Sequence, residues 1–343
     1  MTIVLGLESS CDDTSAALVT STRCILAKVV IDQSRAHQPF GGVVPEIAAR
    51  AHVEILPGLI GKVFDEAKLS IGDVDAVAAT AGPGLIGGVM VALLAGKGLA
   101  LASGKPLIAV NHLEGHALSP RLIDADLGFP YLLLLVSGGH CQLLEARGVG
   151  DYRRLSTTID DAVGEAFDKA AKLLGLGYPG GPAIEALAKQ GDAAAVLLPR
   201  PLLGSDEPHF SFAGLKSAVQ RAAASGDFLQ QDIAASFQQA VVDCLVDRTR
   251  LALERSDAPA LVVAGGVAAN QAIRSALGAL AKEHGRNFVV PPAWLCTDNA
   301  AMIAWAGAER FAAGLVDGLD APARARWPLD PDAEKVRGAG VKA

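Results

Sequence analysis

The sequence lacks the cysteine patterns that cross-link small secreted folds or hold structural zinc. Its 343 residues contain five cysteines, which are scattered along the chain and form no CxxC pair. Such a set argues against a disulfide framework and a zinc ribbon, and fits reduced thiols in a cytosol. Basic residues are also outnumbered, 30 against 37 acidic ones, which leaves a net charge of −7. That charge argues against broad, sequence-independent coating of nucleic acid, although a local basic groove or a basic partner stays compatible with it.

The start of the sequence does not predict a secretion signal. Met1–Glu8 has no basic stretch and its apolar run ends at Glu8, so we expect no signal peptide. Residues 76–96 carry no charge and are long enough to cross a bilayer. However, Gly and Pro at 82–84 and two glycines at 87–88 would break a lipid-exposed helix. We therefore predict a strand, a glycine turn and a helix there, no membrane association, and a cytoplasmic protein.

The residues that are present predict a globular α/β protein with two related halves. Hydrophobic residues make up 51% of the chain, and 343 residues exceed what one compact core usually holds. Residues 3–19 and 131–145 each show a strand, a small polar turn and a second strand, whereas 76–102 and 260–281 each show a strand, glycines and a helix. The recurrence in the same order predicts duplicated lobes, with a phosphate site in the cleft between the two hairpin turns.

Two histidines are candidate metal ligands. His112 and His116 follow an apolar strand at 107–110 and are four residues apart. If a helix begins at residue 112, both imidazoles lie on one helix face and can chelate a divalent transition metal. The alternative is a pair of polar side chains that are hydrogen-bonded or solvated at a helix start. The spacing alone leaves both interpretations open.

Eight motifs along the chain together resemble one protein family. They are Gly6–Thr14, His112–His116, Leu135–His140, Gly164–Asp168, Tyr178–Pro182, Phe210–Lys216, Ala264–Val267 with Asn270, and Cys296–Met302. In this order they resemble the catalytic subunits of tRNA threonylcarbamoyladenosine transferases, the bacterial TsaD family. Each motif alone is weak evidence, whereas eight in one order cover almost the whole chain. One departure is Ser103, where the family usually has a large apolar residue.

The resemblance implies the actin/Hsp70/sugar-kinase fold, an α/β architecture of two duplicated lobes with a nucleotide and metal site in the interlobe cleft. We expect residues 1–112 and 300–330 to form the first lobe. Residues 113–299 are expected to form the second lobe with inserted helices, and residues 331–343 a flexible tail.

The resemblance also implies a ligand set, substrate contacts and a reaction. His112, His116 and Asp298 would bind one Fe2+ per subunit, although Zn2+ or Mg2+ could occupy the site in vitro. The implied reaction moves the threonylcarbamoyl group from threonylcarbamoyl-AMP to N6 of the adenosine 3′ to the anticodon, in tRNAs that read codons beginning with A, and releases AMP. Positions similar to the family's substrate contacts are Leu135, Val136, Ser137, Gly138, Gly139, Asp168, Gly181 and Asn270. The fold argument places Glu8 and Asp12 near the phosphate, and no residue is assigned as the general base.

The expected partners follow from the same resemblance. They are tRNA, the donor threonylcarbamoyl-AMP, a TsaB-like paralogue and a TsaE-like ATPase, and the donor would come from a TsaC-like synthase. Because the net charge is −7, the chain is not expected to hold tRNA over its whole surface. We therefore expect the isolated chain to show little turnover until those proteins are added.

Three other functions fit parts of the sequence. A metalloprotease would need a glutamate next to the first histidine, but Leu113 occupies that position and Glu114 points roughly opposite the shared histidine face. A small-molecule kinase on the same fold would not need the two histidines. The third alternative is a non-catalytic, nucleotide-dependent scaffold. Measurements of metal content and turnover would distinguish it from an enzyme.

Overall fold

Contacts within the chain define two compact units. The structure is a computed structural model that describes residues 1–40 and 42–336. The first unit consists of Met1–Leu127, Gly148–Asp151 and Thr297–Pro331. The second unit consists of Gly128–Arg147, Tyr152–Cys296 and the described residues after Pro331.

These units differ from the lobe limits expected above. The expected limits separate residue 112 from residue 113, which would cut the helix His112–Ile123. That helix packs on the helix Ala300–Ala312, and these contacts keep it in the first unit. The division into actin-like lobes is not the same as a division by contacts, so its limits stay a prediction. Residues 337–343 of the expected tail lie outside the described residues.

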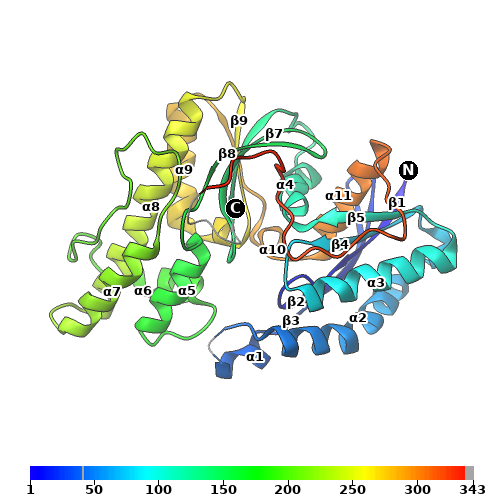
Figure 1. Ribbon diagram of the computed structural model, residues 1–343, viewed down its shortest axis with the longest axis horizontal. Helices are drawn as coiled ribbons and strands as arrows, with labels where there is room; N and C mark the ends of the chain where they lie inside the picture. The colour runs from blue at the N-terminus through cyan, green and yellow to red at the C-terminus, as the bar shows by residue number, and fades with distance from the viewer. Residues whose placement is uncertain (41, 337–343) are drawn as a thin grey trace. The chain divides into compact units, whose positions relative to one another are not determined.

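The first unit contains a five-stranded mixed sheet (Figure 1). Its strands are β1 (Ile3–Glu8), β2 (Asp13–Thr20), β3 (Ile25–Asp32), β4 (Ala76–Gly82) and β5 (Leu107–Asn111). Their order is β3-β2-β1-β4-β5, with β1–β2 and β2–β3 antiparallel and β1–β4 and β4–β5 parallel. The carboxyl ends of β1, β4 and β5 therefore meet at one edge, where the polar residues Glu8, Thr80 and Asn111 lie.

The described residues of the first unit also form five helices. They are α1 (Ser34–His37), α2 (Pro45–Ala67), α3 (Ile86–Ser103), α4 (His112–Ile123) and α11 (Ala300–Ala312), with short 3₁₀ turns at Gln38–Phe40 and Ile71–Asp73. Of these, α2, α3, α4 and α11 pack against this sheet. Figure 1 shows α2 and α3 running side by side. A Cβ at Gly6 would lie 2.3 Å from the Ala300 carbonyl oxygen. Because residue 6 has no side chain, the start of α11 can rest directly on β1, and this contact positions the residues just before α11.

The uncharged stretch at 76–96 forms the strand, turn and helix that the sequence predicts. The strand β4 ends at Gly82, and α3 begins at Ile86. A Cβ at Gly96 would lie 2.8 Å from that of Ala79, so the small residues of α3 allow close packing on β4. Among the described helices, α3 is the one that is long and apolar enough to cross a membrane by length and composition, with a mean hydropathy of 1.7 and 33% of it buried.

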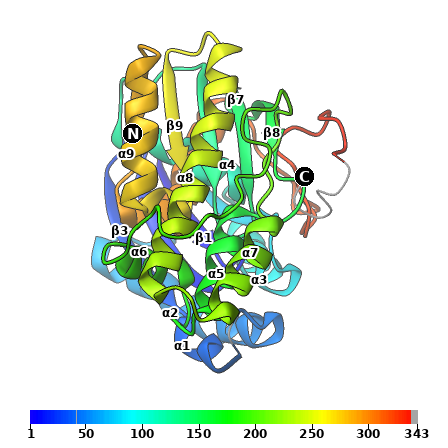
Figure 2. The same cartoon turned by 90° about the vertical axis from the view of Figure 1, so that its left-hand side faces the viewer.

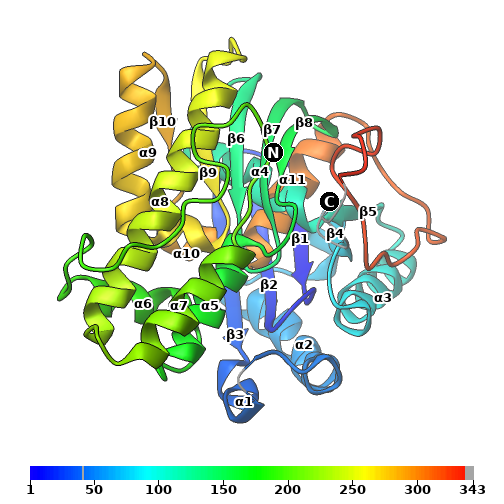
Figure 3. The ribbon, with the colours of Figure 1, turned by 60° about the vertical axis from the view of Figure 1, so that its left-hand side comes forward.

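The second unit repeats the topology of the first (Figures 2 and 3). Its strands are β6 (Tyr131–Val136), β7 (Cys141–Gly148), β8 (Asp151–Thr157), β9 (Ala260–Ala264) and β10 (Asn287–Val289). Their order is β10-β9-β6-β7-β8, with β6–β7 antiparallel and β6–β9 and β9–β10 parallel. Each strand of the first sheet thus has a counterpart in the second, which confirms the predicted duplication.

The second unit is also rich in helices. They are α5 (Val163–Leu173), α6 (Gly180–Ala188), α7 (Ala213–Ser225), α8 (Gln230–Glu254), α9 (Gln271–Glu283) and α10 (Ala293–Cys296), with a 3₁₀ turn at Gly266–Ala269. In Figure 2, α8 and α9 run alongside β9. Phe167, Phe210, Phe212 and Phe237 are fully or almost fully buried in the apolar core beneath these helices. This core fixes the helix starts and turns that carry the predicted substrate contacts.

Candidate metal centre

The helix α4 presents both histidines on one face. The side chain of Asn111 caps the helix by accepting a hydrogen bond from the Leu113 amide at 2.9 Å, so the helix begins at His112 as predicted. Asn111 is itself held by a 3.0 Å hydrogen bond from its amide to the Trp327 carbonyl. The rings of His112 and His116 are buried, and their centroids are 4.8 Å apart.

Asp298 joins the two histidines from the other end of the first unit's sequence. Asn299 caps α11 by accepting a hydrogen bond from the Met302 amide at 3.0 Å, which fixes the residue before it. Asp298 Oδ1 lies 3.1 Å from His116 Nε2 and 3.4 Å from His112 Nε2. One ligand atom from each of the three residues lies within 4.8 Å of the others. The structure therefore brings together the three predicted ligands, although they are separated by up to 186 positions (298 − 112).

The donor set and its surroundings fit a divalent transition metal. Both Nε2 atoms and a carboxylate oxygen converge, and His116 Nδ1 has no partner among the described residues, so the polar contact of that ring runs through Nε2. Two imidazoles and one carboxylate leave open positions for substrate oxygens or water. A group of this composition can hold Fe2+ or Zn2+ and is poorly matched to Ca2+, which prefers oxygen ligands only.

The side chain of Glu8 is buried and contacts the ring of His112. Its carboxylate is fully buried at the end of β1, and Oε2 lies 3.0 Å from His112 Nδ1. The Thr80 hydroxyl donates to the same carboxylate at 2.5 Å, and the Ser10 amide donates to Oε1 at 2.5 Å. A carboxylate that accepts the Nδ1–H keeps that proton on Nδ1, so that Nε2 can bind a metal once it has lost its own proton. The expected phosphate contact of Glu8 and Asp12 stays a prediction, whereas the contact between Glu8 and His112 is present.

The charges of the centre stabilise one another strongly. Burial raises the pKa of Asp298, but the charge of His112 and the hydrogen bonds from His112 and His116 outweigh it and hold that pKa well below 3.8. Burial lowers the pKa of His112, but Asp298 and Glu8 outweigh it and raise that pKa well above 6.5. Nearby, burial raises the pKa of Asp13 to about 8, with further contributions from Asp298 and Asp12. The centre is therefore rich in negative charge, which a bound cation would neutralise.

The predicted substrate contacts belong to the second unit. Leu135 and Val136 are fully buried in β6, and the turn that follows contains Gly138 and Gly139, which are exposed. A Cβ at either glycine would meet nothing within 4 Å, so the backbone of this turn is accessible to a ligand. Ser137 closes the turn, because its hydroxyl accepts a 3.1 Å hydrogen bond from the His140 amide. Backbone amides in such a turn can bind phosphate oxygens.

Gly181 and Asn270 lie at helix starts, and Asp168 lies in the middle of α5, where its side chain contacts the start of α6. Asp168 Oδ1 accepts the Gly180 amide at 2.8 Å, which ties the glycine–proline loop to α5. Asn270 caps α9 through the Ile273 amide, and its side-chain amide donates to Gln238 at 2.9 Å. These contacts give Asp168 and Asn270 structural roles, and their predicted contacts with a nucleotide stay predictions.

The sequence interpretation missed the residues that support the ligands. Thr80 and Ser10 fix the Glu8 carboxylate, and Asn111 fixes the start of α4. One signal was available for Thr80, which is a single hydroxyl in the otherwise apolar strand β4. Because β1 and β4 are parallel neighbours, a polar residue near the end of each is expected to meet the other.

Comparison with known proteins identifies close relatives. The sequence model of the family described as "TsaD: tRNA N6-adenosine threonylcarbamoyltransferase" matches residues 24–305. A protein of that name from Sphingopyxis alaskensis is 72% identical over 344 residues and covers all of both chains. Another from Erythrobacter litoralis is 68% identical, again over the full length of both chains.

Comparison of folds supports the same architecture. HypF from T. kodakarensis matches 91% of this chain and 48% of its own with a TM-score of 0.61 at 15% identity. The (R)-2-hydroxyglutaryl-CoA dehydratase component A of Acidaminococcus fermentans matches 91% of this chain and 100% of its own with a TM-score of 0.54 at 16% identity. These similarities concern the fold alone. Together with the duplicated sheets they confirm the predicted actin/Hsp70/sugar-kinase-like fold class.

Proposed function

The chain belongs to the TsaD family of tRNA N6-adenosine threonylcarbamoyltransferases, and from this membership we propose how its centre contributes to the reaction. The predicted family, enzyme class and formation of threonylcarbamoyladenosine in tRNA are confirmed by these relatives. The observation that carries the mechanistic proposal is the convergence of His112, His116 and Asp298 on one point. This convergence supports a metal-assisted acyl transfer.

The chemistry is an acyl transfer to a weak amine nucleophile. The N6 nitrogen of adenosine forms a bond to the carbonyl carbon of threonylcarbamoyl-AMP, and the bond from that carbon to the phosphate oxygen breaks. AMP leaves with the electron pair, and the proton lost from N6 passes to solvent or to the leaving phosphate. Negative charge develops on the carbonyl and phosphate oxygens, so groups that stabilise anions lower the barrier. We assign no residue as a general base.

We infer that His112, His116 and Asp298 hold one Fe2+ per subunit. The two-histidine, one-carboxylate composition supports iron, and Zn2+ or Mg2+ could replace it in vitro. A bound metal would supply a positive charge for phosphate or carbonyl oxygens of the donor. His112 and His116 would provide Nε2 atoms, and Glu8 would hold His112 in the tautomer that this requires.

For the nucleotide we propose the backbone of Ser137–Gly139 as a phosphate contact, with Leu135 and Val136 forming the strand that supports it. Asp168, Gly181 and Asn270 would contact the sugar and base. The open space above Gly138, Gly139 and Gly181 supports this assignment, because a ligand can reach the backbone there without a clash.

The function is tested by measuring modified nucleosides. Unmodified tRNA is incubated with threonylcarbamoyl-AMP, the chain and its partners, and the digested nucleosides are analysed by mass spectrometry. We expect threonylcarbamoyladenosine with the complete mixture and none when the chain is omitted. If no modified adenosine forms with the complete mixture, the proposed function is wrong.

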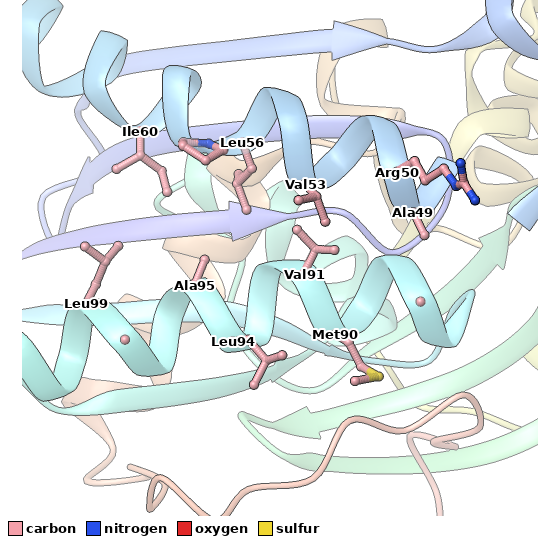
Figure 4. A pocket seen from close by; sticks show the side chains of 13 residues that line it. Ala49, Arg50, Val53, Leu56, Ile60, Met90, Val91, Leu94, Ala95 and Leu99 are labelled. Carbon is pink, nitrogen blue, oxygen red and sulfur yellow. The ribbon is translucent and has the colours of Figure 1, made fainter. Parts of the chain in front are cut away.

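We further propose that the enzyme works in the cytoplasm with a TsaB-like paralogue and a TsaE-like ATPase, on a donor made by a TsaC-like synthase. An apolar groove between α2 and α3 supports a protein partner (Figure 4). The groove has a volume of about 740 Å³, and Arg50 is the one charged residue among those that line it. Val53 and Leu94 are 60% and 56% exposed on its walls. We assign this groove to the TsaB-like paralogue, since solvent-exposed apolar area of this kind marks interaction sites.

A charge placed in the groove should weaken that complex. We expect Leu94→Glu to raise the dissociation constant for the TsaB-like paralogue by about tenfold or more, because the carboxylate would be buried without a partner. Leu197→Glu is the matched control, since Leu197 is 97% exposed and lies in the second unit. Isothermal titration calorimetry measures both variants. Equal affinities for Leu94→Glu and the wild type would contradict the assignment of the groove.

A further inference from the structure

A basic cavity lies in the second unit, separate from the residues assigned above. Its volume is about 270 Å³, and its walls come from the edge strand β8, the preceding strand β7, Pro208 and the last turns of α8. The lining residues include four arginines and no acidic side chain: Arg153, Arg154, Arg248 and Arg255. This is a local concentration of positive charge in a chain whose net charge is −7.

Two of the four arginines are fixed by the protein. Arg248 is 2% exposed, and its guanidinium contacts the carbonyls of Ser205 and Glu207 and the carboxylate of Asp247. Arg154 donates to the carbonyl of Glu334. These contacts fix the side chains of Arg154 and Arg248, and the Asp247 carboxylate balances the charge of Arg248.

The guanidinium groups of the other two arginines have no partner among the described residues. Arg153 on β8 and Arg255 after α8 are exposed, and neither side chain makes a hydrogen bond or an ion pair with a residue that the structure describes. Each guanidinium carries donors in a planar fork that suits two oxygens of one phosphate. Two such exposed groups line one small cavity that has no carboxylate among its lining residues, and this favours an anion over a cation or an apolar ligand.

We propose that this cavity binds a phosphate of the tRNA backbone. The inference rests on the proposed function, which makes tRNA the substrate. A volume of about 270 Å³ suits a phosphate with part of its ribose better than a whole nucleotide. An acidic protein that acts on tRNA needs a local basic surface, because sequence-independent affinity comes from arginine and lysine contacts with phosphates. Arg153 and Arg255 supply these contacts.

The test removes the charges of the two arginines without a partner and leaves Arg154 and Arg248 unchanged. Arg153→Gln/Arg255→Gln is compared with Arg221→Gln/Lys282→Gln, which removes the same charge from exposed positions of the second unit outside the cavity. With the full chain and its partners, we expect the KM for tRNA to rise about tenfold in the cavity variant, with kcat within about twofold of wild type. The slope of log Kd against log salt, measured by fluorescence anisotropy with labelled tRNA, should fall by about one. The control variant should match the wild type in both measurements.

The outcomes separate this inference from the proposed function and from a site for free anions. If the wild type is active and the cavity variant has the same KM and salt slope as the wild type, the inference is wrong and the proposed function still stands. If the wild type forms no modified adenosine, the function fails, while a reduced salt slope in the cavity variant still supports tRNA binding here. Inorganic phosphate and AMP are titrated as a further arm. Loss of phosphate binding in the cavity variant without any change in tRNA affinity overturns the tRNA assignment in favour of a free anion.

Discussion

Replacing Asp298 with asparagine should lower the rate of threonylcarbamoyladenosine formation by on the order of 100-fold or more, and the purified protein should lose its metal. The reason is geometric and electrostatic. Oδ1 of Asp298 lies near Nε2 of both His112 and His116, so this one carboxylate would complete the proposed ligand set. Asparagine keeps the shape but removes the negative charge and offers a neutral, weaker ligand.

The experiment separates a loss of metal from a loss of fold. Metal content is measured by mass spectrometry on the purified protein, and the rate is measured with saturating donor, tRNA and partners. Asp65→Asn is the matched control, because Asp65 is exposed on α2 in the same unit. Thermal unfolding shows whether each variant is folded. An Asp298→Asn protein with normal metal content and normal rate would contradict the ligand assignment.

The same substitution has a consequence for stability without metal. Since the folded-state pKa of Asp298 is held below its ordinary value, its ionised form stabilises the fold above that ordinary value of 3.8, and this contribution is lost as the pH falls through the folded-state pKa. His112 has the opposite sign: its raised pKa stabilises the fold below 6.5, and this contribution is lost as the pH rises through the folded-state pKa. At a pH between the two folded-state pKa values, Asp298 is ionised and His112 is protonated, so the two side chains form an ion pair. Asp298→Asn should therefore destabilise the metal-free protein at neutral pH.

Local patterns in the sequence were sufficient for the elements that carry the histidines. The apolar run at 107–110 predicted the strand β5, and the four-residue spacing predicted the shared face of α4. Asp298 was different, because 182 positions separate it from His116 and no periodicity connects them. Only the family resemblance joined it to the histidines. Physically, the connection depends on the sheet register and on the close contact of α11 with Gly6, which are tertiary features.

Asp160 shows why other assignments could not be made from the sequence. Asp160 and Asp161 precede α5, which begins at Val163, and acidic residues at such a place are typical of the start of the next helix. The Asp160 carboxylate instead accepts the amides of Phe212 and Ala213, at 2.7 and 3.2 Å, at the start of α7. An acidic side chain stabilises whichever helix N-terminus is close in space, whereas a sequence pattern indicates only the next helix in the chain. The buried position of Glu8 was missed for the same reason.

Replacing Glu8 with glutamine should weaken metal binding by about 10- to 100-fold, although Glu8 is not itself among the three converging ligands. The carboxylate accepts a hydrogen bond from His112 Nδ1 and stabilises the charged ring. Glutamine can still accept this bond through its oxygen, but it carries no charge and can also turn its amide donors toward the ring. Both effects weaken His112 as a ligand, and the rate of tRNA modification should fall in parallel with metal occupancy.

The pH dependence of metal affinity distinguishes this positioning role from simple damage to the fold. Metal must displace the proton on His112 Nε2, so affinity should rise by up to about tenfold per pH unit while His112 is protonated, and then become constant. Asp298 and Glu8 both raise the pKa of His112, with burial opposing them. In Glu8→Gln one of the two carboxylates is gone, so the plateau should begin at a lower pH than in the wild type.

A calorimetric titration with Zn2+ at several pH values measures both the affinity and the plateau. Glu114→Gln serves as the comparison, because Glu114 lies on the same helix and its carboxylate is held by the Gly150 amide and Arg310. It should keep the wild-type plateau even if it lowers the unfolding temperature. A plateau at the wild-type pH in Glu8→Gln would show that Glu8 does not control the protonation of His112. A shifted plateau with an unchanged unfolding temperature is the signature of a residue that acts through His112, because a purely structural role changes stability and leaves the proton equilibrium of the ligand in place.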